Sequence, residues 1–266
     1  MNQTSTDTGA KDPRRDCINC GAMVTGRFCA TCGQPTAVER ITWGWLVRQI
    51  PHAVFHMDRG VFRTLHGMLR SPGVTVRDYW AGQRLRTMNP LTFLALMVAL
   101  SALNSILYAS ELESAWRQMM PSIRSETMTL AKLRFQYPLV SQLLNLPALA
   151  LGSWSCFRSF GRTFGEHVIM NTFIVGTMLL IEVPIAWAFI AFSPNAAFAF
   201  TLVASVVTVA YISFVWIQVF RPFRAQTDSA VDFVVRCIGA VFVYFAAITV
   251  TDKFLIEPLI GLVTGA

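Results

Sequence analysis

The run VIMNTFIVGTMLLIEVPIAWAFIAF, residues 168–192, decides the fold class of this chain. As an α-helix it is long enough to cross about 30 Å of hydrocarbon, which takes roughly 20 residues, and Glu182 is its only charged side chain. Four other apolar runs have comparable length: residues 91–109, 138–157, 196–220 and 231–251. We therefore expect an all-α membrane protein with about five transmembrane helices within residues 89–266.

The composition of the whole chain also favours a membrane protein. Of its 266 residues, 54% are hydrophobic and 14% are charged, whereas soluble domains carry about 25% charged residues. Twelve of the 22 lysines and arginines lie before residue 91, and they supply most of the net charge of +7. Because positively charged segments tend to stay on the cytoplasmic side of a membrane, we expect a cytoplasmic amino terminus.

Two C-x-x-C-G turns near the amino terminus are typical of a zinc ribbon, here predicted over residues 17–36 after a disordered polar tail at 1–16. Their four cysteines are Cys17, Cys20, Cys29 and Cys32. Four thiolates suit a tetrahedral Zn²⁺, and the glycine after each pair suits the positive φ that such a turn needs. We expect a structural metal, since four cysteine ligands leave no position open for a reacting water. The same ligands can hold iron, and a redox dithiol pair or a disulfide is the non-metal alternative.

A basic amphipathic segment, residues 40–88, connects the ribbon to the first apolar run. Apolar and basic side chains recur along it on opposite sides at helical spacing, interrupted at Pro51 and Gly60. This pattern predicts helices that lie in the membrane interface, with their cations towards anionic lipid. The alternative is that the segment packs on the membrane domain and its cations are merely solvated. The candidate contacts to lipid headgroups are Arg59, Arg63, Arg70, Arg77, Arg84 and Arg86.

Ionisable side chains within apolar runs are costly, so each is a functional candidate. Glu166, His167 and Asn171 lie at the start of the third run, and Glu182 lies deep within it. Helical spacing places them roughly on one side, where they can relay protons, hold an ion or tie helices together. For Glu166 and His167 the alternative is a simple position at the membrane surface. No known catalytic motif occurs in the chain, which argues against an enzyme.

Several motifs together resemble those of a family of uncharacterised bacterial integral membrane proteins, classed as a domain of unknown function. The first is the ribbon C-x-x-C-G…C-x-x-C-G-Q, which ends here at Gln34. The others are Asp58-Arg59-Gly60, Pro72-Gly73, Arg77-Asp78-Tyr79, Gly82-Gln83-Arg84, Asn89-Pro90 and Glu166-His167. The chain departs from the family at Thr87-Met88, where an aromatic residue is expected. The resemblance implies a location in the bacterial inner membrane but no reaction.

Three functions are compatible with these features. The leading hypothesis is that the ribbon recruits or regulates a protein partner at the membrane, in contact with membrane lipids. The alternative is a transporter or lipid-handling protein that uses Glu182 and the face formed by Glu166, His167 and Asn171. An intramembrane enzyme with His167 as its base is a third hypothesis. Nucleic acid is a disfavoured partner, because the membrane explains the basic residues more simply.

Overall fold

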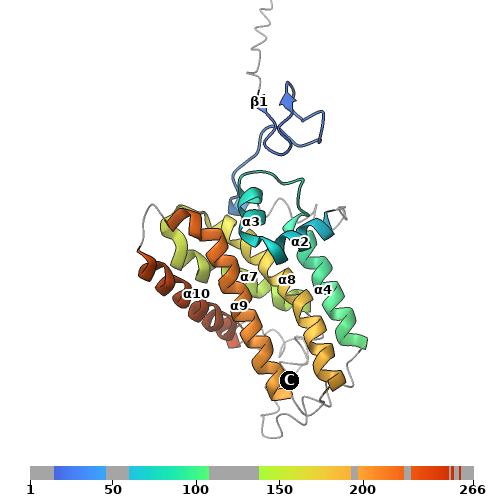
Figure 1. Ribbon diagram of the computed structural model, residues 1–266, viewed down its shortest axis with the longest axis vertical. Coiled ribbons are helices and arrows are strands. Elements are labelled where there is room, and N and C mark those ends of the chain that lie inside the picture. Colours follow the sequence, from blue (N-terminus) through green and yellow to red (C-terminus); the bar gives the residue numbers. More distant parts are fainter. Residues whose placement is uncertain are drawn as a thin grey trace, which may run out of the picture.

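The computed structural model describes residues 15–45, 60–107, 138–192, 197–224 and 229–251, together with positions 253, 254 and 258. Most of the predicted amino-terminal tail lies outside these ranges. Residues 46–59, which belong to the predicted amphipathic segment and include Arg59, also lie outside the described ranges. Within the described ranges the chain is mostly helical, with a small two-stranded sheet near the amino terminus (Figure 1).

The amino-terminal ribbon is a compact pair of turns joined by a short sheet. Strand β1, Arg15–Asp16, pairs antiparallel with β2, Met23–Val24. A second antiparallel bridge joins Phe28 to Pro35. Figure 1 shows that this unit stands beyond the end of the helical bundle rather than inside it.

Five long helices coincide closely with the five predicted apolar runs. They are α4 (Pro90–Leu107), α7 (Pro138–Phe157), α8 (Phe164–Phe192), α9 (Ala197–Arg224) and α10 (Ala230–Thr251). In the described residues, three segments are long and apolar enough to cross a membrane: Phe164–Ile185, Leu202–Phe223 and Val231–Thr251. A shorter apolar helix covers Pro90–Asn104. These segments fit the predicted membrane class, while the count of five spans stays a prediction.

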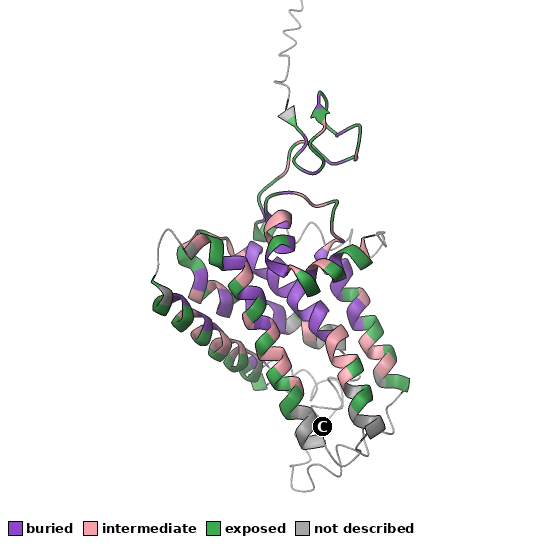
Figure 2. Cartoon of the chain, in the orientation of Figure 1, coloured by how far each residue is buried: buried purple, intermediate pink, exposed green. Residues whose placement is uncertain are grey.

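Helix α8 is the central helix of the bundle. In its apolar stretch 61% is buried inside the protein, against 22% in that of α9 and 18% in that of α10. The outer helices expose large apolar side chains, such as Phe242 and Val231, which suits contact with lipid tails. Buried residues gather at the end of the bundle that carries the ribbon (Figure 2).

Two short helices cross that same end of the bundle. Helix α2 is Val61–Arg70 and α3 is Pro72–Trp80. Pro72 lies at the first turn of α3, where a proline needs no hydrogen-bond donor, and it cannot continue α2. Helix α3 buries Val76, Tyr79 and Trp80 in the main core, so this face of the helix packs on the bundle. The predicted position in the membrane interface stays a prediction. Helix α2 keeps an exposed basic side with Arg63 and Arg70.

The contact between α3 and α9 depends on a proline in α9. Pro222 has no N–H to bond the carbonyl of Gln218 one turn earlier, so that carbonyl needs another donor. Arg77 supplies it, donating to the Gln218 carbonyl oxygen and, at 3.3 Å, to that of Val219. One turn earlier on α3, the N–H of Gly73 donates to the side-chain oxygen of Gln218 at 3.2 Å. Helix α3 is therefore hydrogen-bonded to both the backbone carbonyl and the side chain of Gln218 on α9.

Candidate functional site

The four predicted cysteines of the ribbon lie together in an arrangement that could hold a metal ion. Their sulfur atoms are all within 4.8 Å of one another, and two pairs, Cys17–Cys32 and Cys20–Cys29, are 3.6 Å apart. Sulfur ligands at about 2.3 Å from a tetrahedral metal lie about 3.8 Å from each other, whereas a disulfide needs about 2.05 Å. All four are free thiols. The spacing fits a four-sulfur metal site, and no disulfide joins these cysteines in the structure.

The two C-x-x-C-G turns have nearly identical backbone structures. The N–H of Gly21 donates to the Cys17 carbonyl, and that of Gly33 to the Cys29 carbonyl, each at 2.8 Å. Both glycines have a positive φ, 75° and 77°, as predicted for the residue after each pair. A side chain at either position is strained, because positive φ is rarely adopted by other residues. Each turn therefore presents its two sulfur atoms from the same small loop.

The protonation of the cluster also favours a bound cation. The backbone N–H groups of Cys32 and Thr31, with the neighbouring thiols, lower the pKa of Cys29 to about 6. The N–H of Ala22 acts the same way on Cys20, but desolvation and the adjacent thiols raise the pKa of Cys20 to about 12. Thiolates this close repel one another, so all four ionise together only when a cation offsets their charge.

Three large apolar side chains are exposed on the ribbon. Ile18 is 50% exposed, and Met23 and Phe28 are each 63% exposed. They occupy the first cysteine turn, strand β2 and the residue before Cys29, so they lie on the same small unit as the sulfur atoms. The ribbon therefore presents three large apolar side chains to its surroundings.

Hydrogen bonds hold the ribbon over the bundle. Gln34, the last residue of the C-x-x-C-G-Q motif, is buried, and its side-chain amide donates to the Gly82 carbonyl at 2.7 Å. Arg84 then donates to the carbonyl of Glu39 and stacks on the ring of Trp45 at 4.4 Å. The turn after α3 thus receives both the end of the ribbon and the linker that follows it.

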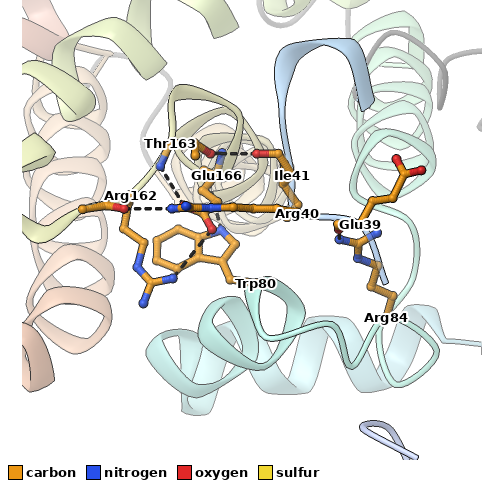
Figure 3. A network of polar contacts seen from close by, with 9 residues as sticks. Glu39, Arg40, Ile41, Trp80, Arg84, Arg162, Thr163 and Glu166 are labelled. Atoms are coloured by element: carbon orange, nitrogen blue, oxygen red, sulfur yellow. Dashed lines mark hydrogen bonds and ion pairs between the residues drawn. The ribbon is translucent and has the colours of Figure 1, made fainter. Parts of the chain in front are cut away.

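The linker continues onto the start of α8, as Figure 3 shows. Thr163 and Glu166 form a capping box there. The Thr163 N–H donates to the Glu166 carboxylate at 2.7 Å, and the Glu166 N–H donates to the Thr163 hydroxyl at 3.2 Å. The same hydroxyl donates to the Ile41 carbonyl at 2.7 Å, and Arg40 and Arg162 each pair with the Glu166 carboxylate at 3.6 Å.

Glu166 is therefore a buried junction residue at a helix start. The Thr163-Phe164-Gly165-Glu166 sequence is the T-x-x-E signature of a capping box, and it is the signal that could have identified Thr163. Arg40 and Trp80 also contact Glu166, and the indole N–H of Trp80 donates to the Glu166 carbonyl at 3.0 Å. Both are distant from Glu166 in the sequence, and no local motif predicts these contacts.

His167 and Asn171 join a buried polar contact between α7 and α8. The Ser153 hydroxyl lies 3.0 Å from Nδ1 of His167 and accepts a hydrogen bond from the Asn171 amide at 2.9 Å. The His167 ring is fully buried and stacks on Phe220 with centroids 5.6 Å apart. No motif in the sequence predicts this role of Ser153. The hydrogen bonds of Ser153 with His167 and Asn171 join α7 to α8.

Glu182 does not join the other predicted polar residues. It lies sixteen residues after Glu166 on the same helix, which is roughly 24 Å along the axis. Among the residues that the structure describes, no ion pair involves Glu182. The four residues predicted as one polar track are thus divided between a junction at the ribbon-side end and a single distant carboxylate.

The predicted lipid-contacting arginines also differ in their surroundings. Arg77 and Arg84 are only partly exposed and donate to carbonyls of the protein itself. Arg63, Arg70 and Arg86 are exposed, and they remain candidates for lipid headgroups. Arg59 lies outside the described residues.

We expect Glu166→Gln to lower the stability of the helical body by about 1–3 kcal/mol. The buried carboxylate would lose its charge while Arg40 and Arg162 keep theirs, although the exposure of both arginines limits the cost. Thermal unfolding of the purified protein in detergent measures the loss, with Glu182→Gln as the control that leaves stability intact. Equal unfolding midpoints for Glu166→Gln and wild type would show that the contacts of the Glu166 carboxylate do not stabilise the helical body.

Comparison with known proteins gives one partial match. Residues 58–102 match a family described as a protein of unknown function (DUF3667). This segment covers α2, α3 and most of α4, and it includes Gly73, Arg77 and Gly82. Neither a curated protein nor a solved structure matches the chain.

Proposed function

We propose that this chain is a multi-pass protein of the bacterial inner membrane whose cytoplasmic zinc ribbon recruits or regulates a protein partner. The observation that carries the proposal is the exposure of three large apolar side chains, Ile18, Met23 and Phe28, on the surface of the small unit that holds the four-cysteine cluster. A four-cysteine site has no position for a substrate, so its role is to hold that surface in shape.

Zinc is the metal that we propose for the cluster. One ligand, Cys20, is exposed, and the unit has few residues with which to shield a metal from solvent. A redox iron requires such shielding to keep a stable potential, while Zn²⁺ has no redox chemistry to protect.

The proposed orientation places the ribbon in the cytoplasm. The ribbon, the α7–α8 connection and the end of α9 all lie at the same end of the bundle (Figure 1). Arginines are concentrated at this end, among them Arg158, Arg162 and Arg221. The positive-inside rule assigns such an end to the cytoplasm.

Site-specific photo-crosslinking in living cells tests recruitment. A photoreactive residue in place of Phe28 should capture a defined partner, and the same residue in place of Phe62, exposed on α2, should not. Adding Ile18→Ser and Met23→Ser should lower the yield by at least about tenfold, because truncating central apolar contacts costs the most binding energy.

The metal content separates a lost contact surface from a misfolded ribbon. The two serine substitutions leave all four cysteines in place, so bound metal should remain at wild-type level. Capture that persists in this variant, or capture of equal strength from position 62, would rule out the ribbon as the recruiting surface.

A further inference from the structure

Helix α2 is fixed to the helical body by its buried side. The Thr64 hydroxyl accepts a hydrogen bond at 2.7 Å from the N–H of Met88, which lies just before α4. One turn further along α2, the Met68 carbonyl accepts a hydrogen bond at 3.1 Å from the Tyr211 hydroxyl of α9. Thr64 and Met68 are both fully buried. These contacts determine which side of α2 faces away from the protein.

The contacts to α9 place α2 and α3 beside a segment of membrane length rather than beyond its end. Tyr211, which bonds to α2, and Gln218, which bonds to α3, both lie within the segment Leu202–Phe223. They precede its ribbon-side end by about 18 Å and about 8 Å of helix. Figure 1 shows the two short helices against this part of the bundle. In a bilayer spanned by this segment, the boundary between headgroups and hydrocarbon would lie near this level.

The exposed side of α2 is divided into an apolar line and a basic line. Phe62 and Leu69 are 83% and 48% exposed, and their spacing of seven residues puts them on one line along the helix. Arg63 and Arg70 have the same spacing and form a second exposed line, about 100° further around the axis. Around the helix, the apolar line lies between the buried Met68 and the basic line. This order is typical of a helix partly sunk in a membrane interface.

Positive charge predominates around this surface. Residues 60–90 contain five arginines and a single carboxylate, that of Asp78, which is half-buried on α3. Neither Arg63 nor Arg70 forms an ion pair in the part of the chain that the structure describes. The connection to α4 adds a further exposed apolar and basic pair, Leu85 and Arg86. The surface is therefore complementary in charge to anionic phospholipid headgroups.

We propose that the exposed side of α2 binds anionic phospholipid, with Phe62 and Leu69 among the acyl chains and the two arginines at the phosphates. Long arginine stems can extend along apolar surroundings while their charged ends reach the headgroups. The position beside the apolar segment of α9 favours lipid over an acidic protein as the occupant. The sequence offered packing on the membrane domain and contact with lipid as alternatives, and α2 has a separate side for each. The proposal rests on the membrane location proposed above, but not on recruitment by the ribbon.

Photo-crosslinking of the purified full-length protein tests this surface. An apolar photoreactive residue replaces Phe62, and the protein is placed in nanodiscs of equal parts phosphatidylcholine and phosphatidylglycerol. Mass spectrometry of the lipid adducts should show phosphatidylglycerol enriched at least about threefold over its share of the bilayer. Adducts in the bulk ratio, or the absence of lipid adducts, would overturn this proposal alone. Failure of the protein to enter nanodiscs would overturn the membrane location as well.

Matched variants locate the lipid preference on α2. Arg63→Gln with Arg70→Gln should reduce the enrichment to less than about 1.5-fold, whereas Arg63→Lys with Arg70→Lys keeps the charge and should retain most of it. The control, Arg27→Gln with Arg158→Gln, removes the same charge from exposed positions outside α2 and should leave the enrichment unchanged. Equal losses in the control and in the α2 glutamine variant would overturn the assignment. So would capture of a protein, rather than lipid, from position 62 in living cells.

Discussion

Removing the metal from the wild-type protein is expected to unfold the ribbon and expose the peptide bond after Arg27 to trypsin. The buried apolar cluster of the ribbon contains only Cys17, Val24 and Cys29, two of which are metal ligands. A structural zinc in so small a unit supplies about 10–16 kcal/mol of apparent binding free energy, most of which stabilises the folded state. In the folded ribbon the Arg27 carbonyl accepts hydrogen bonds from both the N–H and the hydroxyl of Thr36, and unfolding of the ribbon would break both.

Elemental analysis and limited proteolysis check this result. One metal ion per chain is expected, and its identity follows from the same analysis. Cys29→Ser should lose the metal and be cleaved after Arg27 without any chelator. Cys156→Ser, which changes a cysteine outside the ribbon, should keep both the metal and the resistance. Wild-type protein that contains no metal, or that resists trypsin after chelation, would contradict the site.

Gly73→Ala should separate α3 from α9 and lower the stability of the helical body by at least about 3 kcal/mol. A β-carbon at position 73 would lie 2.4 Å from the backbone carbon and oxygen of Gln218, and a helix backbone cannot move aside as a side chain can. The hydrogen bonds that Gly73 and Arg77 make to Gln218 would be lost together, at about 1 kcal/mol each. The carbonyl left without a partner by Pro222 would then be unsatisfied.

Thermal unfolding in detergent micelles, followed by tryptophan fluorescence, measures this loss as a midpoint lower by roughly 10 °C. Gly44→Ala is the matched control, since a β-carbon there meets no atom within 4 Å. Because alanine restricts the unfolded chain more than glycine does, the control should be neutral or slightly stabilising. Similar midpoints for Gly73→Ala and wild type would show that α3 does not rest on α9 as described.

Much of the architecture could be predicted from local patterns. Apolar runs determine where long helices form, because backbone groups in hydrocarbon must bond within their own segment. The start of α7 and the end of α10 therefore agree with the predicted ranges. The cysteine cluster was predictable for a similar reason: the ligands, their spacing and the two glycines all lie within residues 17–33.

The roles of the charged residues could not be predicted in this way. Arg77 and Arg63 look alike on a helical wheel, yet Arg77 satisfies a carbonyl of α9 and Arg63 is exposed. The difference arises from Pro222, far along the chain, which leaves that carbonyl without a partner. For Glu166 the sequence left two positions open, a polar track within the membrane and the membrane surface, and it gave no sign of the contact with Arg40 of the ribbon linker.

The long apolar helices and the cluster of four cysteines could be found from composition and spacing, because each lies within one segment of the chain. Which arginines bond to the protein itself depends instead on how distant segments fold together. These properties depend on which atoms of distant segments meet, and a guanidinium or carboxylate takes its role from the partner that folding places within hydrogen-bond distance.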